Sequence, residues 1–196
     1  MKAVSFLHQK GGTGKSTLAV AAAVSLAQRG ERPLLLDADY QGTAGEWGNR
    51  FGRERRVETL AHVQPDLHER LPALADGREW LLIDGPPSLS PMTESILRAS
   101  TRVIIPVRPA LPDLWALTWP AAMIAKLRKA GRAPETLVVI NMYRGEPLEP
   151  LVEQITELQL AVHEQTIPAD PVYAALFTGA PLPDESARLM LELIGA

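Results

Sequence analysis

The sequence predicts a doubly wound α/β fold, in which a mostly parallel β-sheet is covered by helices on both faces. Short, continuous aliphatic runs of strand length recur along the 196-residue chain and alternate with segments of helical character. Two of these runs close on an acidic residue, at the edge where parallel sheets hold ligands. Because strands and helices alternate throughout, the strands are expected to pair mainly in parallel.

The first half of the chain supplies four expected strands. The helix that follows the first strand is apolar and rich in alanine, and Gly30 is its expected C-terminal stop. The arginine-rich segment 49–56 predicts a surface loop before a short strand. In order, we expect strand 3–7, helix 15–28, strand 33–37, strand 57–60, helix 65–75 and strand 79–84.

The second half continues the same alternation. Pro120 lies inside the segment predicted as a long helix and implies a kink or a break there. The alternating pattern of the last strand suggests an edge position. In order, we expect helix 92–99, strand 102–107, helix 113–129, strand 136–141, helix 147–158, strand 161–167 and helix 184–194.

Composition predicts one globular domain over residues 1–196, because 46% of the residues are hydrophobic and only 22% are charged. No apolar run approaches the roughly 20 residues that span a membrane, and no signal peptide is evident, so we expect a cytoplasmic protein without stable membrane insertion. The absence of cysteine excludes disulfides and thiol catalysis, and four scattered histidines argue against structural zinc. The net charge of −3 argues against a generally basic surface but allows a local basic patch.

A glycine-rich loop stands between the first strand and the first helix. Glycines allow positive φ and bring backbone N–H groups close to phosphate oxygens, while the helix points its positive end at the same place. Lys15 is then expected to reach the β and γ phosphates, and the Ser16 hydroxyl to ligate Mg²⁺. The expected phosphate contacts are Lys10, Gly11, Gly12, Thr13, Gly14, Lys15, Ser16 and Thr17.

The loop departs from the regular P-loop pattern, because Gln9 stands where the first glycine belongs and an additional lysine follows it. The segment from Lys10 to Ser16 resembles the deviant Walker A loop of the ParA/MinD family of P-loop ATPases. In that family the first lysine acts across a dimer interface, which implies a catalytic role for Lys10 beside that of Lys15. A solvated surface lysine is the alternative.

Acidic residues at two strand ends are expected to converge on the same crevice. Asp84 follows four apolar residues, as a Walker B aspartate does, and could hold an Mg²⁺-bound water opposite Ser16. Asp37 and Asp39 lie two residues apart on an extended segment and share a face. They resemble the family's Asp-x-Asp-Pro-Gln signature, which implies Asp37 near Mg²⁺ and Asp39 positioning the attacking water. Tyr40 replaces the usual proline, and a turn-capping role is the alternative for both Asp39 and Asp84.

Three later residues match the places where the family holds adenine: Asn141 at a strand end, and Pro168 and Asp170 after the last strand. An amide can bind an adenine edge, and a proline ring can pack on its face. Ala169 stands where the family often has arginine. An ordinary strand-end turn and a loop proline are the alternatives.

The resemblance is to the small ParA type, so it implies ATP and Mg²⁺ as cofactors and an ATP-dependent homodimer. It further implies sequence-independent binding of double-stranded DNA and hydrolysis stimulated by a ParB-type adaptor, in order to segregate or position cargo. The residues themselves offer a basic cluster that Arg144 and the arginines of 50–56 could extend, although cations at a helix C-terminus also suit its dipole. That cluster comprises Lys126, Arg128, Lys129 and Arg132.

Two alternatives belong to other functional classes. A membrane-positioning ATPase like MinD needs a basic amphipathic C-terminal helix, and the segment 186–196 carries only one arginine and one glutamate. A P-loop ATPase of small-molecule metabolism would use ATP for ligation or reduction, but the sequence shows no cysteines for a cluster and no second domain.

Overall fold

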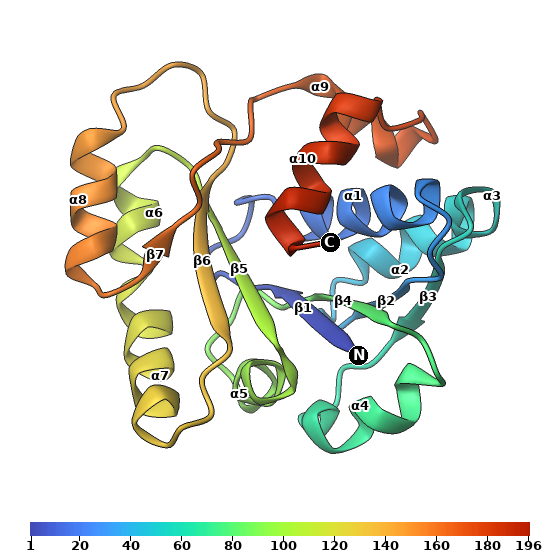
Figure 1. The fold of residues 1–196 in the computed structure, drawn as a ribbon, viewed down its shortest axis with the longest axis horizontal. Coiled ribbons are helices and arrows are strands. Elements are labelled where there is room, and N and C mark those ends of the chain that lie inside the picture. Colours follow the sequence, from blue (N-terminus) through green and yellow to red (C-terminus); the bar gives the residue numbers. More distant parts are fainter.

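The computed structural model describes residues 1–196 and contains one seven-stranded sheet (Figure 1). The strands are Lys2–Phe6 (β1), Leu34–Asp37 (β2), Glu58–Ala61 (β3), Trp80–Asp84 (β4), Arg102–Val107 (β5), Glu135–Ile140 (β6) and Ala161–Val162 (β7). Their order is β3-β2-β4-β1-β5-β6-β7, and every neighbouring pair is parallel. The predicted doubly wound parallel sheet is therefore confirmed.

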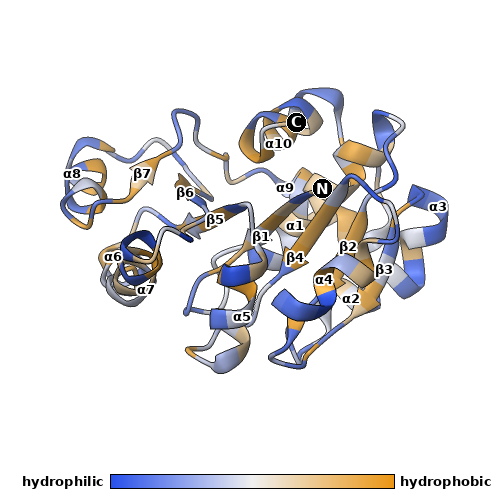
Figure 2. Ribbon diagram, turned by 60° about the horizontal axis from the view of Figure 1, so that its bottom comes forward, coloured by the Kyte–Doolittle hydropathy of each residue, from blue (hydrophilic) through white to orange (hydrophobic).

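Helices cover both faces of the sheet (Figures 1 and 2). The first face carries Lys15–Gln28 (α1), Thr43–Trp47 (α2), Arg53–Arg55 (α3), Pro171–Ala175 (α9) and Asp184–Ile194 (α10). The second carries Leu67–Ala75 (α4), Pro91–Ala99 (α5), Leu111–Trp115 (α6), Thr118–Lys129 (α7) and Glu149–Glu157 (α8). In Figure 2 the central strands are largely hydrophobic, whereas hydrophilic residues lie on the outer turns of the helices.

The side chains of each strand contribute to two separate hydrophobic cores, because successive side chains in a strand point to opposite faces of the sheet. In β4, Leu82 packs with α1 and α10, whereas Leu81 and Ile83 pack with α4, α5 and α7. The apolar side of α10 lies against α1 and buries Met190 and Leu193 completely. The helix that begins at the glycine loop is thus enclosed by the sheet on one side and by α10 on the other.

Three sequence predictions need correction. Residues 49–56 are not a loop, because a π-helical turn, Gly48–Gly52, joins α2 to α3. This segment is held against the sheet by the buried side chain of Trp47 and by the close packing of Gly48 and Gly52 beside Val57 and Thr59. The predicted helix 113–129 is two helices, and the break falls before α7, whose first turn accommodates Pro120. The last strand keeps its edge position but spans only two residues.

Candidate functional site

The carboxyl ends of β1, β2 and β4 form the floor of the candidate site. In the sheet register Phe6 lies beside Asp84, and Asp84 lies beside Asp37. The glycine loop follows β1 closely, and its residues Lys15 and Ser16 lie near enough to Asp84 to influence the pKa of that carboxylate. The structure therefore brings together the loop and the strand-end acids that the sequence had assigned to one crevice.

The glycine loop is shaped by positive backbone angles at Gly12 (φ 74°) and Gly14 (φ 100°). Gly14 is the N-cap of α1 and has the left-handed conformation that favours glycine. A Cβ atom on Gly14 would lie 2.2 Å from the side-chain nitrogen of Asn141, so the loop also requires a glycine here for space. Gly11 and Gly12 are exposed, which leaves their backbone open to a ligand.

Lys15 opens the first turn of α1 and is buried, with only 6% of its surface exposed. Its ammonium nitrogen lies 3.3 Å from the carbonyl oxygen of Lys10, to which it donates. Burial lowers the pKa of Lys15, whereas the negative charges of Asp84 and Asp39 oppose that shift. A buried cation that faces two carboxylates beside a glycine loop is well placed to neutralise an anion.

Asp84 is completely buried, and neither of its carboxylate oxygens has a hydrogen-bond partner in the protein. Burial raises its pKa to about 7, and the charge of Asp37 adds to the shift. The charge of Lys15 opposes the shift, and so does the nearby Ser16 hydroxyl, although this hydroxyl does not meet the geometry of a hydrogen bond to either oxygen. Buried polar groups are nearly always satisfied, so two unpaired oxygens indicate a missing partner. No group of three or more His, Asp or Glu side chains is arranged to hold a metal ion by itself.

Asp37 and Asp39 differ in their surroundings. Asp37 is buried and already accepts two backbone N–H groups, from Asp39 at 3.1 Å and from Gly45 at 2.6 Å. Burial raises the pKa of Asp37, and these hydrogen bonds oppose the shift. Asp39 is partly exposed and accepts from the backbone of Gln41, while the Tyr40 ring between them is 78% exposed. Asp37 thus orders the loop after β2, and Asp39 retains a more open carboxylate.

The residues predicted for adenine line a cavity of about 290 Å³ beside the first turn of α1. The Asn141 amide donates to the carbonyl oxygen of Thr13 over 2.7 Å, which ties the end of β6 to the glycine loop. Arg144, which was expected from the sequence to extend the basic cluster, instead lines this cavity together with Ala169, the residue that supplies no cation. The complete lining is Thr17, Leu18, Asn141, Met142, Arg144, Pro168, Ala169, Asp170, Pro171, Tyr173 and Ala174.

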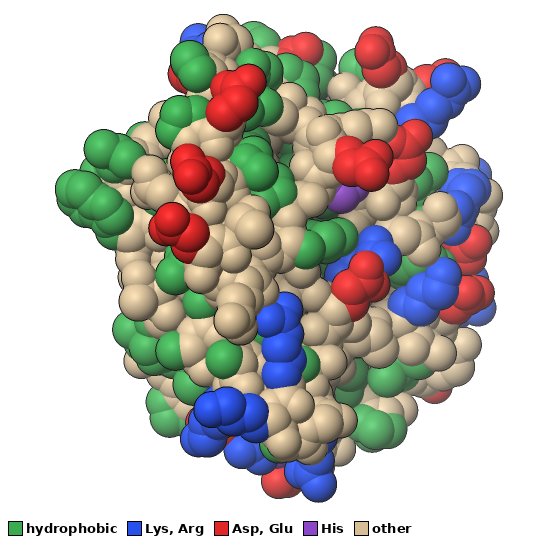
Figure 3. Space-filling view, turned by 60° about the vertical axis from the view of Figure 1, so that its left-hand side comes forward, with side chains coloured by type: hydrophobic (Ala, Val, Ile, Leu, Met, Phe, Trp, Pro, Cys, Tyr) green, Lys and Arg blue, Asp and Glu red, His purple; other side chains and the backbone are tan.

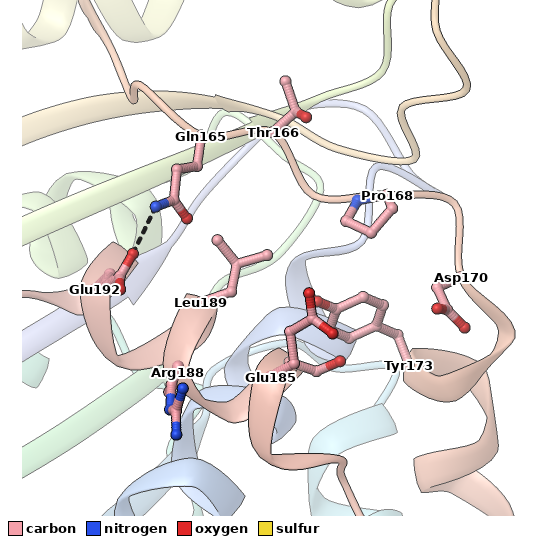
Figure 4. A pocket seen from close by; sticks show the side chains of 10 residues that line it. Gln165, Thr166, Pro168, Asp170, Tyr173, Glu185, Arg188, Leu189 and Glu192 are labelled. Carbon is pink, nitrogen blue, oxygen red and sulfur yellow. Dashed lines mark hydrogen bonds between the residues drawn. The ribbon is translucent and has the colours of Figure 1, made fainter.

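A second, larger pocket of about 430 Å³ lies between the segment after β7 and the outer side of α10 (Figure 4). It shares Pro168, Asp170 and Tyr173 with the predicted adenine cavity. Its lining is mainly polar, and Gln165 donates to Glu192 across it over 2.7 Å. This pocket contains no residue of the glycine loop, so it adjoins the predicted adenine cavity without reaching the phosphate-binding end of the site.

Lys10 does not extend away from its own subunit. Its ammonium group donates to Asp113, at the start of α6, over 2.5 Å, and the same carboxylate also accepts from Arg108. No role for His8, Arg108 or Asp113 was predicted from the sequence. The order of the strands contains a signal for them, because β5 is the neighbour of β1 and both are followed by loops at the same edge of the sheet.

Charge is unevenly distributed over the face that carries α7 and α8 (Figure 3). Basic side chains gather at the bottom of this face, near the end of α7, and acidic ones lie toward the top. The expected extension of the basic cluster is wrong: the arginines of 50–56 lie on α3 and the turn before it, at the opposite end of the sheet, and Arg144 lines the predicted adenine cavity. The cluster itself is exposed and comprises Lys126, Arg128, Lys129 and Arg132.

None of the helices is both long enough and apolar enough to cross a bilayer.

The comparisons with known proteins agree with this geometry. Residues 4–182 match the CobQ/CobB/MinD/ParA nucleotide binding domain. The chain is 32% identical to the chromosome-partitioning ATPase Soj of Thermus thermophilus, over 83% of this chain and 77% of that protein. It is 31% identical to the maintenance of carboxysome distribution protein A of Gloeobacter kilaueensis, over 86% of this chain and 74% of that protein.

The fold is also that of solved members of the same group. The Cyanothece McdA(D38A)-ATP complex superimposes with a TM-score of 0.77 at 16% sequence identity and covers 100% of this chain and 96% of its own. The family match spans most of the chain, and the site lies where the strand order places it. The chain therefore belongs to the ParA/MinD family of nucleotide-binding ATPases.

Proposed function

We propose that this protein is a ParA-like, Mg²⁺-dependent ATPase whose residues 1–196 act as one ATPase domain that pairs around bound ATP. In this proposal the dimer binds duplex DNA without sequence preference, and a ParB-type adaptor stimulates hydrolysis in order to segregate or position cargo. One observation carries the enzymatic part: buried Lys15 faces the completely buried Asp84, whose two oxygens lack partners, beneath a loop of exposed glycine backbone.

The phosphate-binding role follows from the local chemistry. Positive φ angles at Gly12 and Gly14 allow backbone N–H groups to converge on phosphate oxygens, and the N-terminus of the 14-residue helix α1 adds its partial positive charge. Lys15 forms no salt bridge within the protein, and its ammonium group donates only to the carbonyl oxygen of Lys10. Its charge therefore remains available to β and γ phosphates.

The residues also fit Mg²⁺, which prefers oxygen ligands and retains several waters. Ser16 would supply a hydroxyl ligand, and the unpaired oxygens of Asp84 would hold a water of the metal shell. A metal ion held by these residues would supply positive charge against the phosphates during transfer. Asp37 also faces this region but is already engaged by two backbone N–H groups, so its contribution would be to orient the metal shell.

Hydrolysis requires a positioned water, and Asp39 is the carboxylate best placed to hold it. Asp39 is partly exposed and close enough to act electrostatically on both Lys15 and Asp84. Asn141, Pro168 and Asp170 would hold the adenine, because their cavity opens beside Thr17 at the same end of α1. Arg144 would supply there the positive charge that Ala169 lacks.

Several observations support the cellular role. The relatives include a chromosome-partitioning ATPase and carboxysome distribution proteins, both of which suggest the positioning of large cargo. The exposed basic cluster at the end of α7 needs only phosphate contacts to bind DNA without sequence preference. The apolar side of α10 is occupied by α1, which makes this helix a poor membrane anchor and disfavours the MinD-like alternative.

The test measures ATP hydrolysis and particle mass together. Wild-type protein with Mg-ATP should form a dimer and hydrolyse ATP slowly, and random duplex DNA together with an adaptor should raise the rate. Lys10→Ala should retain ATP binding but lose hydrolysis, because the family resemblance implies that this lysine acts across the dimer. Unchanged turnover in Lys10→Ala would exclude the paired mechanism, and no turnover in wild type with DNA and adaptor present would exclude the ATPase assignment.

A further inference from the structure

Asp113 is the centre of a buried cluster at the junction of the glycine loop and α6. The side chain of Asp113 is fully buried, yet it makes two ion pairs, with Lys10 and with Arg108. Arg108 donates through Nε at 2.8 Å, through Nη2 at 2.9 Å and through its backbone N–H at 3.2 Å. Burial alone would raise the pKa of Asp113, but the bonds from Arg108 and Lys10 hold it well below its usual range.

His8 connects the backbones on the two sides of this cluster. The Lys10 N–H donates to Nδ1 of His8 over 3.0 Å, so Nδ1 is the accepting nitrogen. The proton is then on Nε2, which lies 3.2 Å from the carbonyl oxygen of Asp113 and donates to it. His8 is almost completely buried, and burial lowers its pKa, which favours this neutral form. The backbone of Lys10 is thus linked to Asp113 through His8, and its ammonium group is bound to Asp113 directly.

The ion pair between Lys10 and Asp113 can break without leaving a buried charge uncompensated. Removing one partner of a buried pair normally leaves an uncompensated charge and is strongly destabilising. Here Arg108 still binds both oxygens of Asp113 when Lys10 leaves, so the buried carboxylate keeps a counter-charge. The Lys10 side chain itself is 35% exposed and can return to water.

The glycine loop supplies a connection to the nucleotide. Lys15 donates to the carbonyl oxygen of Lys10, and Lys15 is also the proposed phosphate ligand. Phosphate oxygens would compete for this ammonium group and remove one of the contacts that fix Lys10. Loading of the site therefore acts directly on the residue that Asp113 holds.

We propose that Asp113 is a positioning residue that holds Lys10 within its own subunit and so opposes pairing until nucleotide is bound. The proposal rests on the proposed function, in which Lys10 acts across the dimer. Asp113 and Lys10 then set the protein concentration at which ATP-loaded subunits pair. Arg108 keeps the buried carboxylate neutralised in both states.

The first experiment measures the contact without reference to activity. Nucleotide-free protein is treated briefly with an amine-acetylating reagent, and the modification of each lysine is followed by mass spectrometry. Lys10 should react more slowly than the exposed Lys126 and Lys129 of the same molecule, and Asp113→Asn should accelerate Lys10 about five-fold while leaving those two unchanged. Equal Lys10 rates in wild type and Asp113→Asn would overturn the proposal.

The second experiment measures pairing by sedimentation in the presence of Mg-ATP. Asp113→Asn should dimerise at an about ten-fold lower protein concentration than wild type. Asp66→Asn, which removes a surface carboxylate paired with His62 and Arg70, should behave as wild type. Asp113→Glu, which keeps the charge beside Arg108 but displaces the carboxylate, replaces Asp113→Asn if circular dichroism shows that the latter does not fold.

The outcomes separate this inference from the proposed function. If wild type dimerises and Asp113→Asn pairs equally or more weakly, Asp113 does not oppose pairing and the inference is wrong. If neither protein dimerises although Lys10 has become reactive in Asp113→Asn, the paired mechanism itself is wrong, while the holding contact between Asp113 and Lys10 is established.

Discussion

The side-chain amide of Asn141 donates to the carbonyl oxygen of Thr13. The same amide nitrogen lies so close to Gly14 that a Cβ atom added to Gly14 would be 2.2 Å from it. The end of β6 therefore both anchors the glycine loop and fixes the residue type at its most constrained position. This contact joins the predicted adenine-binding strand end to the predicted phosphate-binding loop.

Gly14→Ala should destabilise the protein and abolish ATP binding. The left-handed conformation costs a non-glycine residue about 1–2 kcal/mol, and displacing Asn141 removes a hydrogen bond worth about 1 kcal/mol. Urea denaturation and ATP titration would measure the two effects. Gly131→Ala is a suitable control, because Gly131 has φ 66° but no neighbour within 4 Å of an added Cβ. Equal losses of ATP binding in both variants would contradict the steric argument.

Lys15→Ala should lose ATP binding by at least 100-fold while keeping its fold. The variant removes the only ammonium group that lies between Asp84, Asp39 and the loop, and charged hydrogen bonds contribute about 1.5–3 kcal/mol each. Calorimetric titration with a non-hydrolysable ATP analogue and Mg²⁺ would measure the affinity. Lys129→Ala serves as the matched control. An affinity within a few-fold of wild type would remove Lys15 from the phosphate site.

Asp39→Ala should retain ATP binding and accumulate as a stable ATP-bound dimer. The carboxylate of Asp39 is open and engages only the backbone of Gln41, so its removal leaves the loop contacts of Asp37 intact. Hydrolysis in a single-turnover assay should fall by at least 100-fold. If the variant hydrolyses ATP at the wild-type rate, Asp39 does not position the water.

The raised pKa of Asp84 predicts that the free energy of unfolding depends on pH. Burial raises the pKa of Asp84 to about 7 in the folded protein from 3.8 in an unfolded chain, so the folded state retains a proton that the unfolded chain has lost. The stabilisation is present at low pH and is lost as pH rises from about 4 to about 7. Between pH 5 and pH 8, nucleotide-free wild type should lose on the order of 2–3 kcal/mol relative to Asp84→Asn.

Urea denaturation of both proteins at the two pH values would check this difference. Mg-ATP should reduce it in the wild type, since a bound cation favours the ionised carboxylate. A constant difference between the two proteins across this pH range would show that Asp84 is ionised throughout.

The basic cluster makes a prediction for DNA. A Lys126→Glu, Lys129→Glu double variant should bind random duplex at least ten-fold more weakly in the presence of ATP at 0.1 M salt, with unchanged ATP affinity. Its affinity should also depend less steeply on salt, because each lost phosphate contact lowers the logarithmic slope by about 0.9. The control is Arg50→Glu, Arg53→Glu, at the opposite end of the sheet. Equal weakening by both double variants would indicate a net-charge effect instead of a local contact.

Local patterns predicted the elements of this fold well wherever the chain is buried on a parallel sheet. The ends of α1, β5 and α10 agree with the sequence prediction residue for residue. The segment 49–56 was predicted wrongly, because Gly48 and Gly52 permit close packing against Val57 and Thr59, and because Arg55 is part-buried and donates to the carbonyl oxygen of Gly179. Polar composition alone could not reveal that packing.

The parts of the candidate site that belong to recognisable sequence motifs were predicted from the sequence. The glycine loop and the strand-end acids lie together as expected, because strand ends in a parallel sheet share one edge. Asp113 was missed for a physical reason: the sequence contains no local signal that its carboxylate is buried, and its ion pairs join residues more than 100 positions apart or across a tight turn. Arg144 was assigned to the wrong surface, because it lines the predicted adenine cavity and not the surface at the end of α7.

The ends of the chain lie close together, since the ammonium group of Lys2 donates to the carbonyl oxygen of Gly195 over 3.4 Å. Both ends are at the amino edge of the sheet, on the side away from the glycine loop. A fluorescent protein fused to residue 1 or 196 would therefore project away from the face where two subunits are proposed to meet. Live-cell imaging of either fusion should follow the movement of a functional molecule, and a short peptide bridge between the two ends would permit circular permutation.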